Sequence, residues 1–267
     1  MSANARTWHY GLVARWWAEF NQGEGEEEEL AYFQRAIAAA GEPVLDAGCG
    51  NGRLLLPLVR SGLDVDGTDA SEDMLAWCRK GAEADRIQVN LYAQPMHALD
   101  LPRRYRTVIA CGVFGVGGTR ADDLEGLRRI RGLLEPGGTL LMDYHYPKAE
   151  DRGSQTRDRP ASFPEAWPEV GDRRTASDGT ELEMRSRTIG WDPKEKKVTR
   201  EIWLRQYRQG VEVASETNTI DICIYALDEV RELLEQARFR SIRLTGALED
   251  RSPRIGEDTR IFFHASP

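Results

Sequence analysis

Apolar and polar residues alternate along the chain with two different spacings. Up to about residue 145, short apolar runs that predict buried strands are separated by amphipathic stretches that predict helices. This order is typical of a parallel sheet covered by helices on both faces. The strands are expected at residues 44–46, 63–69, 87–93, 107–111 and 139–143.

The pattern changes beyond residue 147. Residues 147–178 are rich in proline, arginine and acids without a regular period, so we expect a long loop or the base of a cap. Strand-like runs at residues 180–191, 197–208 and 211–225, separated by turn sequences, predict an antiparallel meander. A helix that begins at Asp228 and two short strands at 241–248 and 259–264 complete the chain.

Two helices are expected before the first strand. Within residues 5–20, Trp8, Leu12, Trp16 and Phe20 recur every four positions, which predicts one helical face. This helix either packs on the core or forms a lid over a ligand. The acidic run of residues 24–29 is expected to be the solvated first turn of the next helix, where carboxylates favour the helix dipole.

A glycine-rich loop follows the first predicted strand. Asp46, Gly48, Gly50 and Gly52 form the pattern D-x-G-x-G-x-G between an apolar strand and a helix start. Glycines let the backbone approach a ligand closely, and the helix N-terminus presents free N–H groups there. The pattern predicts a nucleotide-like ligand at the carboxyl end of this strand.

The loop does not match a dinucleotide-binding fingerprint. That fingerprint requires a third glycine at the position of Arg53, where it permits close helix–strand packing. Asp46 would also repel a pyrophosphate, whereas it would attract an ammonium or a sulfonium group. The loop therefore favours a cationic ligand over a dinucleotide.

The stretch from Val44 to Arg53 resembles motif I of the class I S-adenosylmethionine (SAM)-dependent methyltransferases. The later segment in which a helix leads into Leu134-Glu135-Pro136-Gly137-Gly138 is similar to the same family. The resemblance implies a Rossmann-like α/β fold with a seven-stranded, mostly parallel sheet, helices on both faces and an antiparallel β cap inserted after strand five. It divides the chain into a SAM-binding core (1–146), a substrate cap (147–225) and a final helix and strands (226–267).

The resemblance also assigns the cofactor residues. Asp46 and the glycine loop would hold the methionine portion of SAM, and Asp69, at the end of the second strand, would accept hydrogen bonds from the ribose. Pro95 stands where the family often has an acid that binds adenine, so the Gln94 side chain or the Met96 N–H is expected to replace it. The expected cofactor residues are Tyr10, Trp17, Asp46, Gly48, Cys49, Gly50, Gly52, Arg53, Asp69, Ala70, Met74, Gln94, Pro95, Met96 and Cys111.

Candidate catalytic and substrate residues lie at the end of the fifth strand and in the cap. His145 is the leading catalytic candidate because this sheet edge faces the ligand crevice, with Tyr144 and Tyr146 as alternatives. Tyr10 is a further catalytic candidate on the N-terminal segment. The substrate is expected to contact Phe114, Tyr146 and the inner face of the cap, for which Trp191, Trp203 and Tyr207 are candidates.

The composition of the chain limits the classes of partner and ligand that it is expected to bind. The 267 residues carry a formal net charge of −8, which disfavours nucleic acid as a substrate. The four cysteines form no C-x-x-C pair, so we expect reduced thiols of a cytoplasmic protein and no metal site. We find no apolar run of membrane-spanning length and no signal peptide, and we leave room for a homodimer.

The predicted reaction is methyl transfer from SAM to a small molecule, with S-adenosylhomocysteine as the product. We favour an amine nitrogen as acceptor by a small margin, because a sheet after strand five is found in glycine/sarcosine and sugar-amine N-methyltransferases. O- or C-methylation of an aromatic metabolite is an alternative. Two others are an NAD-dependent oxidoreductase and a SAM-binding regulatory or partner protein without catalytic activity.

Overall fold

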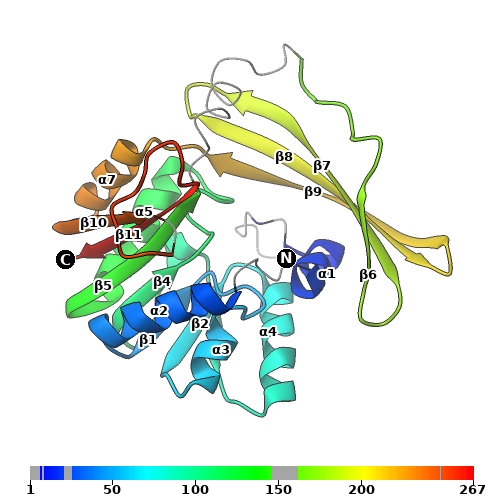
Figure 1. Ribbon diagram of the computed structural model, residues 1–267. Helices are drawn as coiled ribbons and strands as arrows, with labels where there is room; N and C mark the ends of the chain where they lie inside the picture. Colours follow the sequence, from blue (N-terminus) through cyan, green and yellow to red (C-terminus); the bar gives the residue numbers. More distant parts are fainter. Residues whose placement is uncertain (1–6, 8, 21–25, 146–161, 247) are drawn as a thin grey trace.

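The computed structural model describes residues 7, 9–20, 26–145, 162–246 and 248–267. These residues form a core built on one sheet and a second sheet that overhangs it (Figure 1). The core sheet has the strand order β10-β11-β5-β4-β1-β2-β3. Its strands are β1 (Val44–Ala47), β2 (Val65–Asp69), β3 (Asn90–Ala93), β4 (Tyr105–Ala110), β5 (Leu134–His145), β10 (Ser241–Gly246) and β11 (Arg260–Ser266).

Strands β1 to β5 run parallel, and β11 pairs antiparallel with both β5 and β10. The C-terminal hairpin therefore closes one edge of the sheet, as predicted. Strand β5 begins at Leu134, earlier than expected, because its start pairs with Tyr105 across a register shift in β4.

Helices cover both faces of the core sheet. One face carries α2 (Glu26–Ala40), α3 (Leu55–Arg60) and α4 (Glu72–Asp85), whose apolar residues pack with Leu141 and Phe262 of the sheet. The other face carries α5 (Arg120–Leu133), α7 (Leu227–Gln236) and the short 3-10 helix η1 (Met96–Ala98), and α5 and α7 pack with Leu140 and Phe263. Neighbouring residues of one strand thus enter opposite cores, as strand geometry requires.

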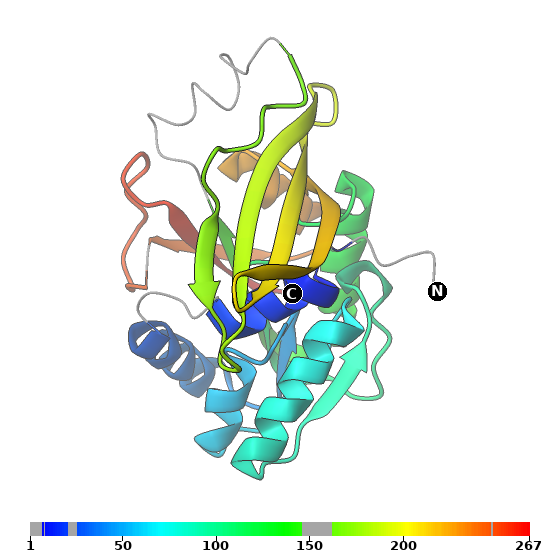
Figure 2. The same cartoon turned by 90° about the vertical axis from the view of Figure 1, so that its right-hand side faces the viewer.

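The second sheet is an antiparallel meander that we call the cap sheet. It contains β6 (Asp172–Thr175), β7 (Glu181–Asp192), β8 (Lys197–Arg208) and β9 (Val211–Cys223), in that order. Helix α1 (Gly11–Phe20) packs beneath it through Leu12, Val13 and Trp16, which contact Leu182, Ile202 and Leu204 (Figure 2). The predicted α/β fold with an inserted antiparallel cap is confirmed.

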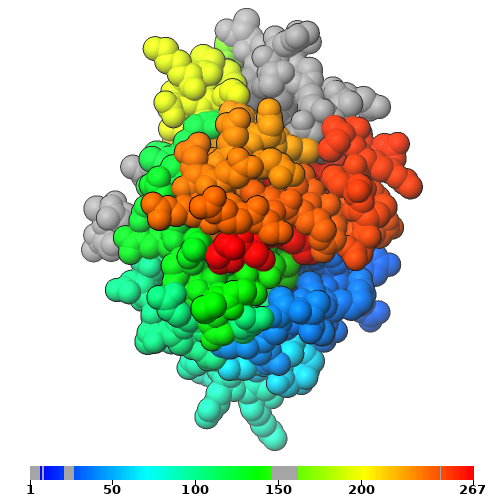
Figure 3. Space-filling model, turned by 90° about the vertical axis from the view of Figure 1, so that its left-hand side faces the viewer, coloured from blue at the N-terminus to red at the C-terminus, as the bar shows by residue number. Residues whose placement is uncertain are grey.

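On the side of the molecule seen in Figure 3, the C-terminal elements share the surface with earlier parts of the core. Helix α7 and the residues that follow it form a continuous surface above α2 and β5 (Figure 3). The chain enters the cap after β5 and returns to the core at α7, so residues from both ends of the sequence complete the core sheet. The boundaries predicted at residues 146/147 and 225/226 remain predictions.

Candidate active site

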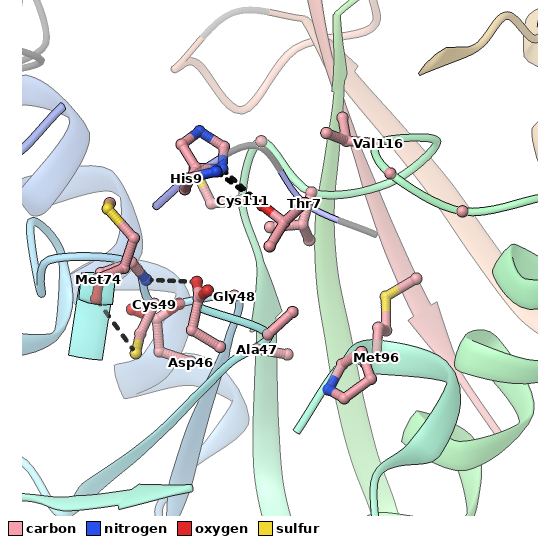
Figure 4. Close-up of a pocket in the computed structure, with 18 of the residues that line it drawn as sticks. Thr7, His9, Asp46, Ala47, Gly48, Cys49, Met74, Met96, Cys111 and Val116 are labelled. Atoms are coloured by element: carbon pink, nitrogen blue, oxygen red, sulfur yellow. Dashed lines mark hydrogen bonds between the residues drawn. The ribbon is translucent and has the colours of Figure 1, made fainter. Parts of the chain in front are cut away.

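A cavity of about 410 Å³ lies where β1, β2 and β4 end, beneath the cap sheet. Its volume falls within the range of small-molecule pockets, roughly 300–1,000 Å³. Met74 and Met96 lie on opposite sides of it, and Thr7 and His9 lie above the Gly48 loop (Figure 4). The position matches the ligand crevice expected outside the carboxyl ends of parallel strands.

The three glycines of the loop, Gly48, Gly50 and Gly52, have different structural roles. Gly48 has φ +82°, and a Cβ there would lie 2.2 Å from Cγ1 of Val113, so only glycine fits. Gly50 lines the cavity beside Met74. Gly52 does not line it: a Cβ there would lie 2.7 Å from the Cys78 sulfur and from Leu56, between α3 and α4. The assignment of Gly52 to ligand contact is therefore wrong, because its role is close packing behind the loop.

Two acids flank the loop, as predicted. Asp46 is buried, and this burial raises the pKa of its carboxyl to about 7. Asp69 accepts hydrogen bonds from the N–H groups of Gly50 (2.9 Å) and Ser71 (2.8 Å), so it also holds the loop in place. Burial raises the pKa of Asp69, and these N–H groups oppose that shift. The loop therefore stands between two carboxylates, as a cationic ligand requires.

A buried charge cluster forms one side of the cavity. Glu29 of α2 pairs with Arg53 of the loop and, at 2.5 Å, with Arg260 of β11. Arg260 also pairs with Asp143 of β5 at 2.6 Å, and its Nη2 lies 3.0 Å from the sulfur of Cys111. Glu29, Arg53, Cys111 and Arg260 all line the cavity.

The sequence prediction for Glu29 is wrong. It was expected in a solvated first turn, but it is 4% exposed and bonded to two arginines. Arg260 lies 231 positions away, so no local pattern could join these residues. Arg260 is a site residue that sequence reasoning missed.

The N-terminal segment crosses the mouth of the cavity. Thr7, His9 and Trp17 line it, and the rings of His9 and Trp17 meet edge to face at 5.1 Å. The segment is tied to α4, because the Ser71 hydroxyl donates to the His9 carbonyl and Asp73 accepts from the Gly11 N–H at 2.7 Å. This arrangement supports the lid interpretation of the N-terminal segment.

His9 is a second residue that the sequence reasoning missed. Burial lowers the pKa of its imidazole to about 4, so the ring is neutral at physiological pH. Its Nδ1 lies 2.9 Å from the Thr7 hydroxyl. Tyr10, which was expected to contact the cofactor, does not line the cavity. Burial and the nearby charges of Asp69 and Asp73 raise the pKa of Tyr10.

The residues expected around adenine surround one end of the cavity. Ala70, Met74, Gln94, Pro95 and Met96 all line it. The Gln94 side chain, however, bonds the backbone of Asp100, donating at 3.2 Å and accepting at 2.8 Å. It therefore holds its own loop, which leaves the Met96 N–H as the proposed replacement for the family's acid.

The end of β5 separates the catalytic candidates. His145 lines the cavity, with its Nε2 3.7 Å from a carboxylate oxygen of Asp143. Tyr144 points the other way into the core, where its hydroxyl donates to the Tyr225 carbonyl (3.1 Å) and accepts from the Tyr225 N–H (2.7 Å). Tyr144 is therefore corrected from a catalytic candidate to a core residue. Tyr146 lies outside the described residues.

Phe114 is also a core residue. It is buried and packs on the rings of Tyr225 and Tyr144, with centroid distances of 5.1 and 6.2 Å. It does not line the cavity, so its assignment to substrate contact is wrong. The neighbouring Val113 and Val116 line the cavity in its place.

Trp203 lies on the wrong face of the cap sheet for the predicted substrate contact. Its neighbours Ile202 and Leu204 point toward α1, so strand alternation turns Trp203 to the opposite face. There it stacks under the Arg205 guanidinium at 3.5 Å and donates to the Ser215 hydroxyl at 2.8 Å. Tyr207 shares that face, because its hydroxyl donates to Glu183 at 3.3 Å.

Asp123 is a buried acid at the start of α5 that also lines the cavity. It accepts from the Tyr225 hydroxyl at 2.6 Å and from the Gly115 N–H at 3.3 Å. Burial raises the pKa of this carboxyl to about 6. Asp123 thus fixes the glycine-containing segment after β4 to α5 and to the end of the cap.

Comparison with known proteins identifies the domain. Residues 44–138 match the family model described as a methyltransferase domain. This match spans the glycine loop and both of its acids.

This part of the chain is therefore a methyltransferase domain. The methyltransferase domain extends from β1 to the turn within β5, and its recognition from the sequence is confirmed.

Curated relatives are similar to part of this chain. A ubiquinone biosynthesis O-methyltransferase of Coxiella burnetii is 29% identical over 113 residues, which cover 42% of this chain and 47% of the relative. The chain spans about half the length of the curated relatives it matches.

Two solved structures show the same fold over nearly the whole chain. The CcbJ methyltransferase of Streptomyces caelestis has a TM-score of 0.72 at 20% identity, covering 97% of this chain and 98% of that one. SAM-bound CalS10, an amino pentose methyltransferase of Micromonospora echinaspora, has a TM-score of 0.63 at 18% identity, covering 96% and 97%. The cap sheet is therefore part of the shared fold.

Across those residues, the structure holds no group of three or more histidine, cysteine or acidic side chains that could bind a metal ion. No helix in that part of the chain is long and apolar enough to cross a membrane.

Proposed function

We propose that this protein transfers a methyl group from SAM to a small-molecule acceptor and releases S-adenosylhomocysteine. The observation that supports this most is the cavity at the Gly48 loop, with Asp46 and Asp69 on its two sides. A phosphorylated ligand would be repelled by both acids, whereas an ammonium and a sulfonium would be attracted.

The residues present fit SAM. Gly48 and Gly50 line the cavity without a side chain, where a Cβ would lie 2.2 Å from Val113 and 3.3 Å from Met74, respectively. Asp46 would attract the ammonium, Asp69 would accept from the ribose hydroxyls, and Arg53 is the cation nearest the loop for the carboxylate. Met74, Pro95 and Met96 would contact the adenine.

When bound, SAM supplies a methyl group that is already activated by its sulfonium centre. The protein then has to position the acceptor and keep water away. His9 and Trp17 of the N-terminal segment would exclude water from above the cavity. His145 is the proposed residue for holding the acceptor or accepting its proton; His145→Ala should lower turnover more than SAM affinity, and unaltered turnover would remove this role.

The acceptor atom is proposed to be an amine nitrogen. This proposal rests on the cap sheet. The structural match to the amino pentose methyltransferase CalS10, which includes the cap sheet, covers 97% of the CalS10 chain. The alternative is an oxygen, which the name of the Coxiella burnetii relative favours.

Calorimetry and a turnover assay test the proposal. SAM and NADH are titrated separately into the purified chain, and S-adenosylhomocysteine formation is then measured with a panel of amines, phenols and indoles. We expect binding of SAM alone and turnover with amines. Binding of NADH without SAM would indicate an oxidoreductase, and SAM binding with no turnover would favour a regulatory protein. If the panel gave O- or C-methyl products and no N-methyl product, the nitrogen assignment would be overturned.

A further inference from the structure

The two faces of the cap sheet have different surroundings. We define the inner face as the one that contacts α1; it carries Leu182, Ile202 and Leu204. The strand pairings place Thr188, Arg200, Ile220 and Asn218 on this face as well, because directly paired residues share a face. Exposure of β9 agrees, since its inner residues are more buried than their neighbours.

The inner face borders the cavity. Val116, which lines the cavity, pairs with Ile222 at the edge of β9 and so points to the inner side. Helix α1 covers the next part of this face at Ile202 and Leu204. The row that contains Thr188, Arg200 and Ile220 lies between these two contacts. It is one step from the Ile222 row, roughly 7 Å along the strands.

Arg200 is the cation of this row, and it has no acid beside it. Its guanidinium donates to the Ser186 hydroxyl at 2.7 Å, and its Nε is buried without a hydrogen-bond partner. Among the residues that the structure describes, no carboxylate lies within 4.0 Å of it.

Each of three arginines on the outer face pairs with a carboxylate. Arg185 pairs with Glu183 at 2.7 Å, Arg187 with Glu201 at 2.7 Å, and Arg205 with Glu212 at 3.7 Å. The Nε of Arg205 is also buried without a hydrogen-bond partner, so the feature that distinguishes Arg200 is the absence of a paired carboxylate among the described residues. The same strands therefore neutralise their outer arginines and leave the inner one unneutralised. A half-buried, permanently charged guanidinium with an unmet N–H donor is costly unless an anion comes to it.

We propose that Arg200 binds an anionic group of the methyl acceptor, a carboxylate or a phosphate. The planar fork of a guanidinium matches either group with two parallel hydrogen bonds. This inference rests on the proposed function and narrows its substrate class: the acceptor combines a nucleophilic atom that reaches the cavity with an anionic end under the cap sheet. Such an end also needs a cation to enter a cleft rich in acids.

The experiment uses acceptor pairs that differ only in the anionic group. One arm compares amino acids of increasing length with their carboxamides, and the other compares phosphorylated amino alcohols with the free alcohols. Binding of each compound to the protein loaded with S-adenosylhomocysteine is measured by calorimetry, and turnover with SAM is measured in parallel. We expect an anionic member to bind at least about tenfold more tightly than its neutral twin. The arm that shows the difference identifies carboxylate or phosphate.

Three variants connect the difference to Arg200. Arg200→Gln should abolish the preference for the anionic member, and Arg200→Lys should retain part of it. Arg208→Gln, which removes the same charge from an exposed position on the same strand, should leave the preference intact. A preference that survives in Arg200→Gln would overturn the inference.

Thermal stability gives a readout that needs no acceptor. Because Arg200 has no acid partner among the described residues, Arg200→Met should leave the melting temperature unchanged or raise it, whereas Arg187→Met should lower it by leaving Glu201 without its arginine. An equal drop in both variants would make Arg200 structural and overturn the inference. If neutral twins bind and react as well as anionic ones, the inference fails while the proposed function stands; if SAM does not bind, the proposed function itself fails.

Discussion

The cavity has a floor, formed by the core, and a roof, formed by the cap sheet, and the sequence specifies these two parts differently. The floor is the Gly48 loop with Asp46 and Asp69, residues that lie within 24 positions of each other at the carboxyl ends of two adjacent strands. The roof is the inner face of the cap sheet, and which side chains it presents depends on strand pairing across the meander. The floor is therefore specified locally, and the roof by register.

One side of the floor departs from this rule. The charge cluster brings Glu29 and Arg53 together with Asp143 and Arg260 from the far end of the chain. Its members are buried or half-buried, so each charge depends on the others for compensation. This cluster is the point at which the local floor becomes dependent on tertiary structure.

Removing the Arg260 charge should give the largest effect. Arg260→Met leaves Glu29 and Asp143 with less compensation, and the loss of one partner from a buried pair costs about 3–5 kcal/mol of unfolding free energy. Urea denaturation measures this loss. The matched control is Arg254→Met, since Arg254 makes only an exposed contact with Glu257 and should change stability by less than about 0.5 kcal/mol. Similar small losses in both variants would show that the cluster is not a unit.

A glycine pair tests the shape of the floor. Gly48→Ala combines φ +82° with a contact to Val113, whereas Gly62→Ala has φ +88° and nothing within 4 Å. Both should lose about 1–2 kcal/mol from backbone strain, and Gly48→Ala should lose about 1–3 kcal/mol more. Only Gly48→Ala should also weaken SAM binding, by at least about tenfold, as measured by calorimetry. Equal behaviour of the two variants would contradict a role for Gly48 in close approach.

Asp69→Ala tests the floor's proposed contact with the ribose. It removes an acceptor for the ribose and for the N–H groups of Gly50 and Ser71, so SAM affinity should fall about 10- to 100-fold without unfolding the chain. The control is Asp85→Ala, at the far end of α4, where Asp85 pairs only with Arg60. Unchanged SAM affinity in Asp69→Ala would remove the ribose role.

The pH dependence of SAM binding should report Asp46. With its pKa raised to about 7, the carboxyl becomes protonated and neutral as the pH falls through that value. SAM affinity should therefore decrease between about pH 7.5 and about pH 5.5, as measured by calorimetry. Asp46→Asn should bind weakly with a flat profile over the same range. A wild-type profile without this decrease would indicate that Asp46 does not attract the cofactor.

The smallest expected effect concerns the roof. Pairing with Val198 places Trp191 on the inner face, whereas Trp203 lies on the outer one. Trp203→Phe should leave the acceptor KM within about twofold of wild type, and Trp191→Phe should change it several-fold. Steady-state kinetics with any acceptor found by the panel provides the measurement. A larger KM change in Trp203→Phe would place the substrate on the outer face.

The sequence was informative where neighbours along the chain are also neighbours in space. Asp46, Gly48, Asp69 and Met74 could be placed in the site because strand ends and helix starts bring them together. Glu29 could not, because its burial depends on Arg260, and nothing near it signals that partner. An acidic run alone indicates solvent exposure.

The cap errors have a different cause. Aromatic residues were expected to face the substrate, but the side chain of Trp203 is covered by Trp167 and Arg205 on the outer face. Because Ile202 and Leu204 are apolar and Trp203 lies between them, strand alternation already predicts that Trp203 faces away from the side that these two residues bury. The same reasoning applies to Tyr144, which follows Leu140 and Met142 into the α5 and α7 core.

Arg260 has one further consequence. The methyltransferase family model matches residues 44–138, which contain neither Arg260 nor Glu29 nor Asp143. A fragment cut to that match would leave Arg53 without its carboxylate partner Glu29, and Cys111 would keep Arg53 as a neighbour but lose Arg260. A unit that keeps this charge cluster is therefore longer than residues 44–138, and it has to include both α2 and the last strand.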